Sequence, residues 1–149
     1  MRYWILIADA AGARVFSAIA SKAPLHLERQ IANPDGRART QDLVTDEPGR
    51  YRKGAEPKSA MDPRTTAHEA VVEQFTRDLV EMLDEEARRG NFDSLAIVAP
   101  PHLLGLLRSE LTRQLTSRLK ATLAKDLAHI GADQLRPHLT PVFTPGLFA

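Results

Sequence analysis

Two short, uninterrupted runs of apolar residues constrain what this chain can fold into. Residues 3–8 are aromatic and β-branched at the centre of the run, and residues 94–99 follow a segment with helical periodicity. Strands inside a parallel sheet are covered on both faces and are apolar throughout, whereas half-exposed strands alternate. The two runs therefore predict an α/β fold, with residues 3–8 as its central strand and residues 94–99 as a parallel strand in a β-α-β unit.

The first part of the chain predicts antiparallel strands beside the central one. Residues 9–12 carry a turn signal, and residues 13–18 would close a hairpin on the first strand. In residues 25–31, Leu25 and Leu27 alternate with polar residues, which is typical of a half-exposed edge strand. Three antiparallel strands are therefore expected to open the domain.

A long stretch without periodicity follows the third strand. From residue 33 to about residue 61, neither the strand period nor the helix period is present, and turns with proline and glycine recur. Connections this long in compact domains are usually functional or disordered. A helix is expected beyond the stretch, starting at Asp62-Pro63 or one turn later at Thr66, and ending at Arg88-Arg89-Gly90.

The leucine-rich part after Pro100-Pro101 fits two structures. Leucines recur every four residues from 107 to 127, as on one helix of more than twenty residues. Alternation across residues 119–123 fits a strand equally well. A last short helix is expected at about residues 133–139, before a proline-bounded apolar tail at residues 140–149.

Size and composition bound the remaining possibilities. A chain of 149 residues is near the usual size of one domain, so residues 1–149 are expected to share a single core. There is no cysteine, which excludes disulfides and thiolate chemistry. The net charge is +1, so a nucleic-acid contact requires a local patch. The apolar run that ends before Asp9 is too short for a signal peptide or a membrane span, which predicts a cytoplasmic protein without a membrane contact.

Four segments carry a resemblance to a known family: residues 7–16, 42–50, 99–108 and 125–127. Their motif residues are Asp9, Arg14, Asp42, Asp46, Gly49, Pro100, Pro101, Gly105, Arg108, Lys125 and Asp126. In this order, over about residues 3–139, the chain resembles the bacterial host attachment protein family, described as proteins required for attachment to host cells. The combination is much more specific than any one segment.

The resemblance also implies a fold. The host attachment family is similar to the middle domain of archaeal and eukaryotic peptide-chain release factors, which has a ribonuclease H-like fold. It therefore implies a five-stranded mixed sheet of order 3-2-1-4-5, with helices on both faces. It also favours a strand over a helix at residues 119–123.

Two departures from these relatives argue against catalysis. Release factors act through a Gly-Gly-Gln loop, and this chain has no two adjacent glycines. Ribonuclease H chemistry needs several convergent carboxylates around two metal ions, but two prolines instead of an acid follow Ala99. Asp9 suits a turn, and the five histidines have no ligand spacing. We therefore expect no metal, no cofactor and no catalytic residue.

Two candidate anion sites are present in the sequence. The first, which we call the basic loop, can clamp phosphates and stack a base and consists of Arg37, Arg39, Arg50, Tyr51, Arg52 and Lys53. A solvated loop closed by an Asp46–Arg50 pair is an equally good interpretation. The second is the helix start at Pro100-Pro101-His102, where backbone N–H groups favour anions, although a rigid connector also explains it.

Three hypotheses about function follow. The leading one is a non-catalytic cytoplasmic module that binds RNA or a ribosomal partner through the basic loop, with an indirect role in attachment to host cells. The second is a metal-dependent hydrolase or nuclease that uses Asp9, Asp126 and a loop carboxylate, Asp42 or Asp46. The third is a module for protein interaction or oligomerisation built on apolar residues of the tail: Val142, Phe143, Leu147 and Phe148.

Overall fold

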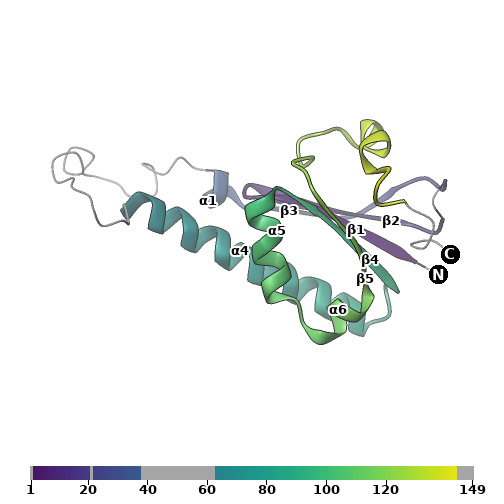
Figure 1. The fold of residues 1–149 in the computed structure, drawn as a ribbon, viewed down its shortest axis with the longest axis horizontal. Helices are drawn as coiled ribbons and strands as arrows, with labels where there is room; N and C mark the ends of the chain where they lie inside the picture. The colour runs from purple at the N-terminus through teal and green to yellow at the C-terminus, as the bar shows by residue number, and fades with distance from the viewer. Residues whose placement is uncertain (1, 21, 38–62, 144–149) are drawn as a thin grey trace.

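The computed structural model describes residues 2–20, 22–37 and 63–143, and these residues form a mixed sheet of five strands (Figure 1). The strands are β1 (Tyr3–Asp9), β2 (Gly12–Ala18), β3 (His26–Ala32), β4 (Ser94–Ala99) and β5 (Leu119–Ala124). Their order is β3-β2-β1-β4-β5. β1 is antiparallel to β2 and parallel to β4, and β4 is parallel to β5. The expected strand order and directions are confirmed.

Helices occupy the connections between strands. In the described residues they are α1 (Pro34–Arg37), α4 (Pro63–Arg88), α5 (Pro101–Glu110), α6 (Arg113–Arg118) and the 3₁₀ helices η1 (Ala132–Gln134) and η2 (Arg136–Leu139). α4 begins at the earlier of its two expected starts, and Gly90 beyond its end has a φ of 76°, as a helix-terminating glycine does. α1 lies inside the stretch expected to be loop, because a single helical turn is too short to show a period. No helix in the described residues is both long and apolar enough to cross a membrane.

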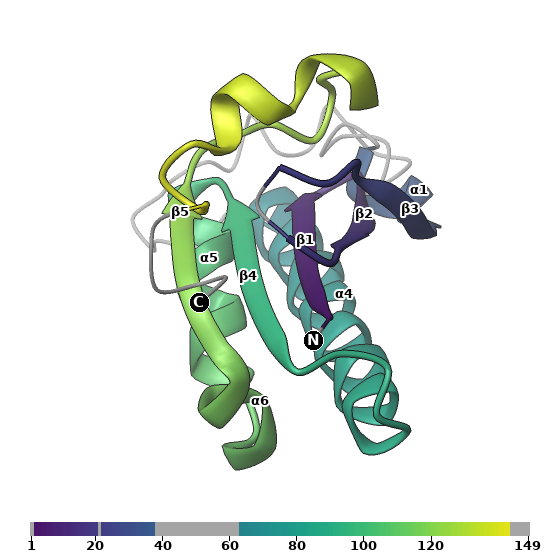
Figure 2. The ribbon, with the colours of Figure 1, turned by 90° about the vertical axis from the view of Figure 1, so that its right-hand side faces the viewer.

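Side chains of β1 alternate between two buried faces of the sheet. Trp4 and Leu6 belong to a hydrophobic cluster with the apolar sides of α4 and α5, which lie behind the sheet in Figure 2. Ile5 and Ile7 belong to a second cluster on the opposite face. All four side chains are at most 3% exposed. Burial on both faces explains why this part of the sequence has no polar alternation.

The chain after β5 covers the second face of the sheet. Four buried residues of this segment complete the second cluster: Leu127, Leu135, Leu139 and Val142. The short helix expected here consists of two 3₁₀ turns, because Pro137 has no N–H with which to continue α-helical hydrogen bonding. The start of the apolar tail thus docks on the domain itself, and residues 144–149 lie outside the described residues.

The leucine-rich segment is two helices and a strand. Leu111 and Thr112, between α5 and α6, are extended, with ψ angles of 137° and 168°. Thr112 is the N-cap of α6, since its Oγ1 accepts a hydrogen bond from the Leu115 N–H at 3.1 Å. β5 follows α6 directly, so the strand expected at residues 119–123 is confirmed.

β3 is an exposed edge strand. Leu27 is 51% exposed, and Ile31 is partly buried against the first cluster. The register between β2 and β3 shifts between Val15 and Phe16, and bulges of this kind turn side chains to new directions at sheet edges. The alternation of Leu25 and Leu27 with polar residues therefore does not bury Leu27.

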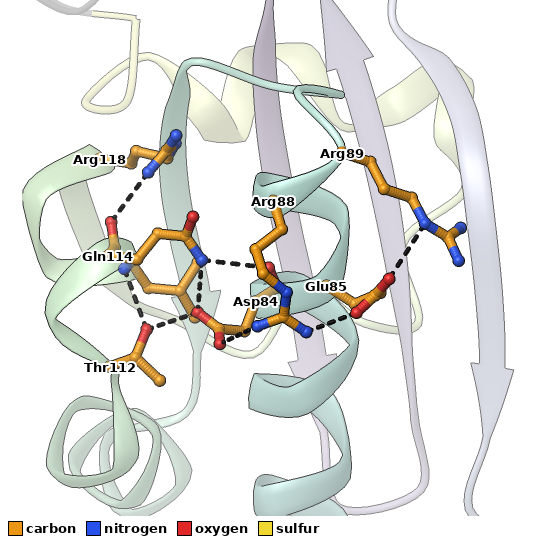
Figure 3. A network of polar contacts seen from close by, with 8 residues as sticks. Asp84, Glu85, Arg88, Arg89, Thr112, Gln114 and Arg118 are labelled. Carbon is orange, nitrogen blue, oxygen red and sulfur yellow. Dashed lines mark hydrogen bonds and ion pairs between the residues drawn. The ribbon is translucent and has the colours of Figure 1, made fainter.

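A polar network joins the C-terminal half of α4 to α6 (Figure 3). The Asp84 carboxylate accepts hydrogen bonds from Thr112 Oγ1 at 2.6 Å and from Gln114 Nε2 at 2.8 Å. Arg88 Nη1 lies 3.0 Å from its other oxygen. The hydrogen bond from Thr112 is the main cause that holds the pKa of Asp84 below its usual range. Thr112 therefore has two roles, because it caps α6 and ties that helix to α4.

Thr112→Ala should lower the free energy of unfolding by about 1–2 kcal/mol, because the substitution removes an N-cap and leaves Asp84 without its main donor. Urea unfolding monitored by circular dichroism measures the loss. Thr112→Ser keeps the hydroxyl and should unfold like the parent. Thr116→Ala, at an exposed position of the same helix, should change the free energy by less than about 0.5 kcal/mol. Equal losses at positions 112 and 116 would contradict the role of the network.

Candidate functional site

A cleft of about 360 Å³ opens where β1 ends, and its volume is in the range of small-ligand sites. The β1–β2 turn, the end of β3 and the chain after β5 form its walls. Its polar lining residues are Asp9, Arg14, Gln30 and His129. β1 has an antiparallel neighbour on one side and a parallel neighbour on the other. Ligands of open α/β sheets bind beyond the carboxyl ends of parallel strands, so the cleft lies where the topology favours a binding site.

Asp9 organises the turn at the mouth of the cleft. Its Oδ1 accepts hydrogen bonds from the backbone N–H groups of Ala11 at 2.9 Å and Gly12 at 3.0 Å. These are the contacts expected of an aspartate that stabilises a turn. A Cβ at Gly12 would lie 2.9 Å from the Ile31 carbonyl oxygen, so the turn also needs glycine to approach β3. One oxygen of the Asp9 carboxylate is therefore occupied by the fold.

Arg14 connects the sheet to the segment that covers it. Its Nη2 donates hydrogen bonds to the carbonyl oxygens of Leu127 at 3.1 Å and Ile130 at 2.7 Å. The guanidinium carbon lies 5.4 Å from the centre of the Phe16 ring. Burial lowers the pKa of Arg14 from its usual range, and the Asp9 carboxylate offsets part of this effect. Among the described residues, nothing accepts a hydrogen bond from its buried Nε.

The two aspartates of the hydrolase hypothesis do not line the same cleft. Asp126 has a side chain that is 54% exposed, and its Oδ1 lies 3.7 Å from His129 Nδ1 at the rim. In the part of the chain that the structure describes, no three His, Asp or Glu side chains are placed to hold a metal ion together. Asp42 and Asp46 lie outside that part. The fold thus brings Asp9 near Arg14 and leaves Asp126 outside the cleft.

α1 packs against the β1–β2 turn beside the cleft. The Asn33 N–H donates to the Ala11 carbonyl at 2.8 Å, and Asn33 Nδ2 donates to the Ala10 carbonyl at 2.9 Å. Gly36 lies so close that an added Cβ would be 1.9 Å from the Ala10 carbonyl oxygen, so only glycine fits there. Asn33 and Gly36 were not among the expected site residues. Their proline- and glycine-containing segment indicated a turn, but it carried no information about the surface on which the turn packs.

α1 ends at Arg37, so the basic loop begins beside the cleft. The other residues of the basic loop lie outside the described residues: Arg39, Arg50, Tyr51, Arg52 and Lys53. Three motif residues of the family also lie outside them: Asp42, Asp46 and Gly49. α1 contacts α4, which resumes the described chain at Pro63 (Figure 1).

The second candidate anion site already holds a carboxylate. Pro100 is the N-cap of α5, with Pro101 next to it. His102 Nε2 lies 2.8 Å from Glu69 Oε2, which brings a carboxylate from α4 to the start of α5. This contact ties the start of α5 to α4. The contacts favour the rigid-connector interpretation.

The remaining motif residues of the family are exposed. A Cβ at Gly105 would meet nothing within 4 Å, so this glycine is not required for a close approach to any described residue. Arg108 on α5 and Lys125 after β5 are both exposed. Neither of these two cations lines the cleft.

Arg14→Met should lower the free energy of unfolding by roughly 1.5–3 kcal/mol, because two carbonyl groups lose a charged donor. Amide hydrogen exchange should accelerate most at Ile130, whose N–H donates to the Leu127 carbonyl at 3.1 Å. Arg77→Met, at an exposed position of α4, is the control and should leave both quantities near those of the parent. An equal acceleration at Ile130 and at Leu6 in the central strand would show that Arg14 does not act locally on this segment.

The chain is similar to proteins of other organisms. An uncharacterized protein of Rickettsia prowazekii (strain Madrid E) is 26% identical over 131 residues, which cover 87% of this chain and 81% of that protein. A solved structure described as an archaeal protein matches with a TM-score of 0.51 and 11% identity, over 99% of this chain and 36% of the archaeal chain. The chain thus spans little more than a third of the archaeal protein, and at this identity the likeness concerns the fold alone.

A family model described as "Protein required for attachment to host cells" matches residues 4–139. The matched range extends from the second residue of β1 through η2 and therefore includes all five strands except Tyr3, and all walls of the cleft. The similarity to release factors and the ribonuclease H-like assignment stay predictions. The extent of the match shows that this chain belongs to the family of proteins required for attachment to host cells.

Proposed function

We propose that this domain is a non-catalytic cytoplasmic module that binds RNA, either free or in the ribosome, and that its role in attachment to host cells is indirect. In this proposal the basic loop contacts phosphates and stacks a base. The loop starts at Arg37, at the end of α1, and α1 packs on the turn that lines the cleft at the end of β1. Clustered arginines with an interposed tyrosine are suited to a single-stranded or looped RNA partner.

The packing of α1 against the β1–β2 turn is the observation that carries the proposal. Gly36 fits against the Ala10 carbonyl only because it lacks a side chain, and Asn33 fixes the same turn by two hydrogen bonds. α1 ends at Arg37, the first residue of the basic loop, and Arg14 lines the cleft that the β1–β2 turn borders. Residues 36–64 contain seven arginines and lysines against five acidic residues. A basic segment that follows an element packed beside a ligand-sized cleft favours binding of an anionic partner.

The arrangement of carboxylates supports a non-catalytic role. Two-metal hydrolysis requires acidic side chains that converge on one point. Asp9 shares its Oδ1 between two backbone N–H groups, and Asp126 lies at the exposed rim beside His129. β4 ends at Ala99 and is followed by Pro100 and Pro101. None of these three positions contributes an unengaged carboxylate to a common centre.

Interaction through the tail is the second candidate function. Val142 is fully buried in the second cluster, and the Arg136 guanidinium lies 4.9 Å from the centre of the Phe143 ring. These two apolar residues are therefore committed to the domain's own fold. An interface through the tail would depend on Leu147 and Phe148, which lie outside the described residues.

A variant with Arg50, Arg52 and Lys53 changed to alanine should bind RNA with a flatter salt dependence. Each phosphate contact that is lost reduces the slope of log affinity against log salt by roughly 0.7–0.9, so the slope should fall by about two. Fluorescence anisotropy with a labelled RNA hairpin at several salt concentrations measures it. The variant should unfold like the parent. Unchanged affinity and slope, or a parent protein that binds no RNA, would reject the proposal and favour the tail interface.

Gly36→Ala tests the packing of α1 against the β1–β2 turn, because the new Cβ must displace α1 from the Ala10 carbonyl. We expect a loss of roughly 1–3 kcal/mol in unfolding free energy and a severalfold weaker affinity for the same RNA. Gly105→Ala is the matched control, since its Cβ meets open space inside a helix. It should raise stability by about 0.5–1 kcal/mol and leave RNA affinity unchanged. If the Gly36→Ala variant is folded and binds RNA like the parent, the packing of α1 on the β1–β2 turn does not contribute to RNA binding by the basic loop.

A further inference from the structure

We propose that the surface of the domain formed by α5, α6 and β5 is a second contact surface for RNA phosphates. This inference rests on the proposed function and adds a site to it. The surface, which we call the β5 edge, is formed by five cations of α5, α6 and β5 and the residue after it: Arg108, Arg113, Arg118, Lys120 and Lys125. Residues 101–125 contain a single acidic residue, Glu110, so this stretch is strongly basic although the whole chain has a net charge of only +1.

The fold places the segment that carries these cations at one edge of the sheet. β5 is the last strand of the sheet, and α5 and α6 lie on the same side of the molecule (Figure 2). Arg113 and Arg118 are the first and last residues of α6, a helix only about 9 Å long. Lys120 is exposed at a register shift between β4 and β5, where the ladder leaves it without a partner residue. Three cations therefore lie within one short helix and the start of the next strand.

The charge of the β5 edge is not neutralised within the described residues. None of its five cations forms an ion pair there; Arg118 donates instead to the backbone carbonyl of Gln114 at 3.3 Å. Asp84, the acidic residue tied to α6, is itself engaged by Thr112, Gln114 and Arg88 (Figure 3). By contrast, Arg88, Arg89 and Arg29 are paired with carboxylates of α4. Carboxylates at the C-terminal end of α4 are thus paired with arginines, whereas the cations of the β5 edge are not paired with carboxylates in the part of the chain that the structure describes.

The side chains between the cations favour nucleic acid over a lipid bilayer. Ser109, Thr116 and Ser117 are exposed there, and hydroxyl groups are common partners of phosphate oxygens. Insertion into a bilayer needs large exposed apolar side chains. Among the described residues the large apolar side chains that are exposed are Ile19 and Leu27, which lie after β2 and on β3, at the other end of the sheet. The geometry points to the phosphate backbone of RNA as the occupant.

The test compares two double variants with the same change in net charge. Arg113→Ala with Lys120→Ala removes two cations of the β5 edge. Lys22→Ala with Arg77→Ala removes two exposed cations elsewhere, after β2 and on α4. Binding of a labelled RNA hairpin is measured against salt concentration for both variants, the parent and the basic-loop triple variant. Unfolding curves establish that each protein is folded.

We expect the edge variant to flatten the salt slope by about 1.5, and the control variant to leave it within error of the parent. Combined with the basic-loop substitutions, the two losses should add, because the sites are separate. If the edge variant and the control weaken binding equally, net charge alone is responsible and the β5 edge is not a contact surface. If only the basic-loop variant changes the slope, this inference fails while the proposed function stands.

Two further measurements separate other partners of the same charge. Binding of the parent to vesicles of anionic lipid, lost in the edge variant, with no RNA binding, would overturn both this inference and the proposed function. Salt-sensitive self-association in sedimentation velocity, lost in the edge variant while RNA binding is retained, would assign the β5 edge to a second copy of the chain. Monomeric protein with edge-dependent RNA binding supports the inference.

Discussion

Burial of β1 on both faces is the constraint on which the rest of the structure depends. Leu6 and Ile7 are adjacent in the chain, point to opposite faces, and are both 0% exposed. Two layers must therefore come from later in the chain. α4, α5 and α6 supply one, and the segment that contains Leu127 to Val142 supplies the other. The second layer has little regular structure, so its position depends on apolar burial and on the hydrogen bonds from Arg14.

The cleft is a consequence of where this second layer stops. The layer covers Ile5 and Ile7, but its edge lies at Ala128 and His129, beside the turn that Asp9 organises. Arg14 defines that edge, because its guanidinium holds two carbonyl groups of the layer from the adjacent strand. The same arginine therefore serves the fold and lines the cleft. α1 packs on the β1–β2 turn that forms one wall of the cleft.

Charge is distributed unevenly between the two sides of the helical layer. α4 contains seven of the eight acidic residues of α4, α5 and α6, and two of those in its last turns are paired with Arg88 and Arg89. α5, α6 and β5 carry cations without such pairs. Unpaired exposed cations attract polyanions more strongly than paired ones do, and this asymmetry underlies the proposed contact of RNA with the β5 edge.

The sequence by itself located most of the strands and the long helix, and the family resemblance implied the order of the strands. The two apolar runs located β1 and β4, and the cap and glycine signals located the bounds of α4, because burial period and capping are local properties. It left residues 119–123 open between helix and strand, since a spacing of four and an alternation coincide there. Only the tertiary structure decided that Arg14 holds the segment after β5, that Gly36 packs on Ala10, and that Thr112 ties α6 to Asp84 of α4. Those facts depend on contacts between segments distant in the chain, and a local pattern carries no information about which surface will meet it.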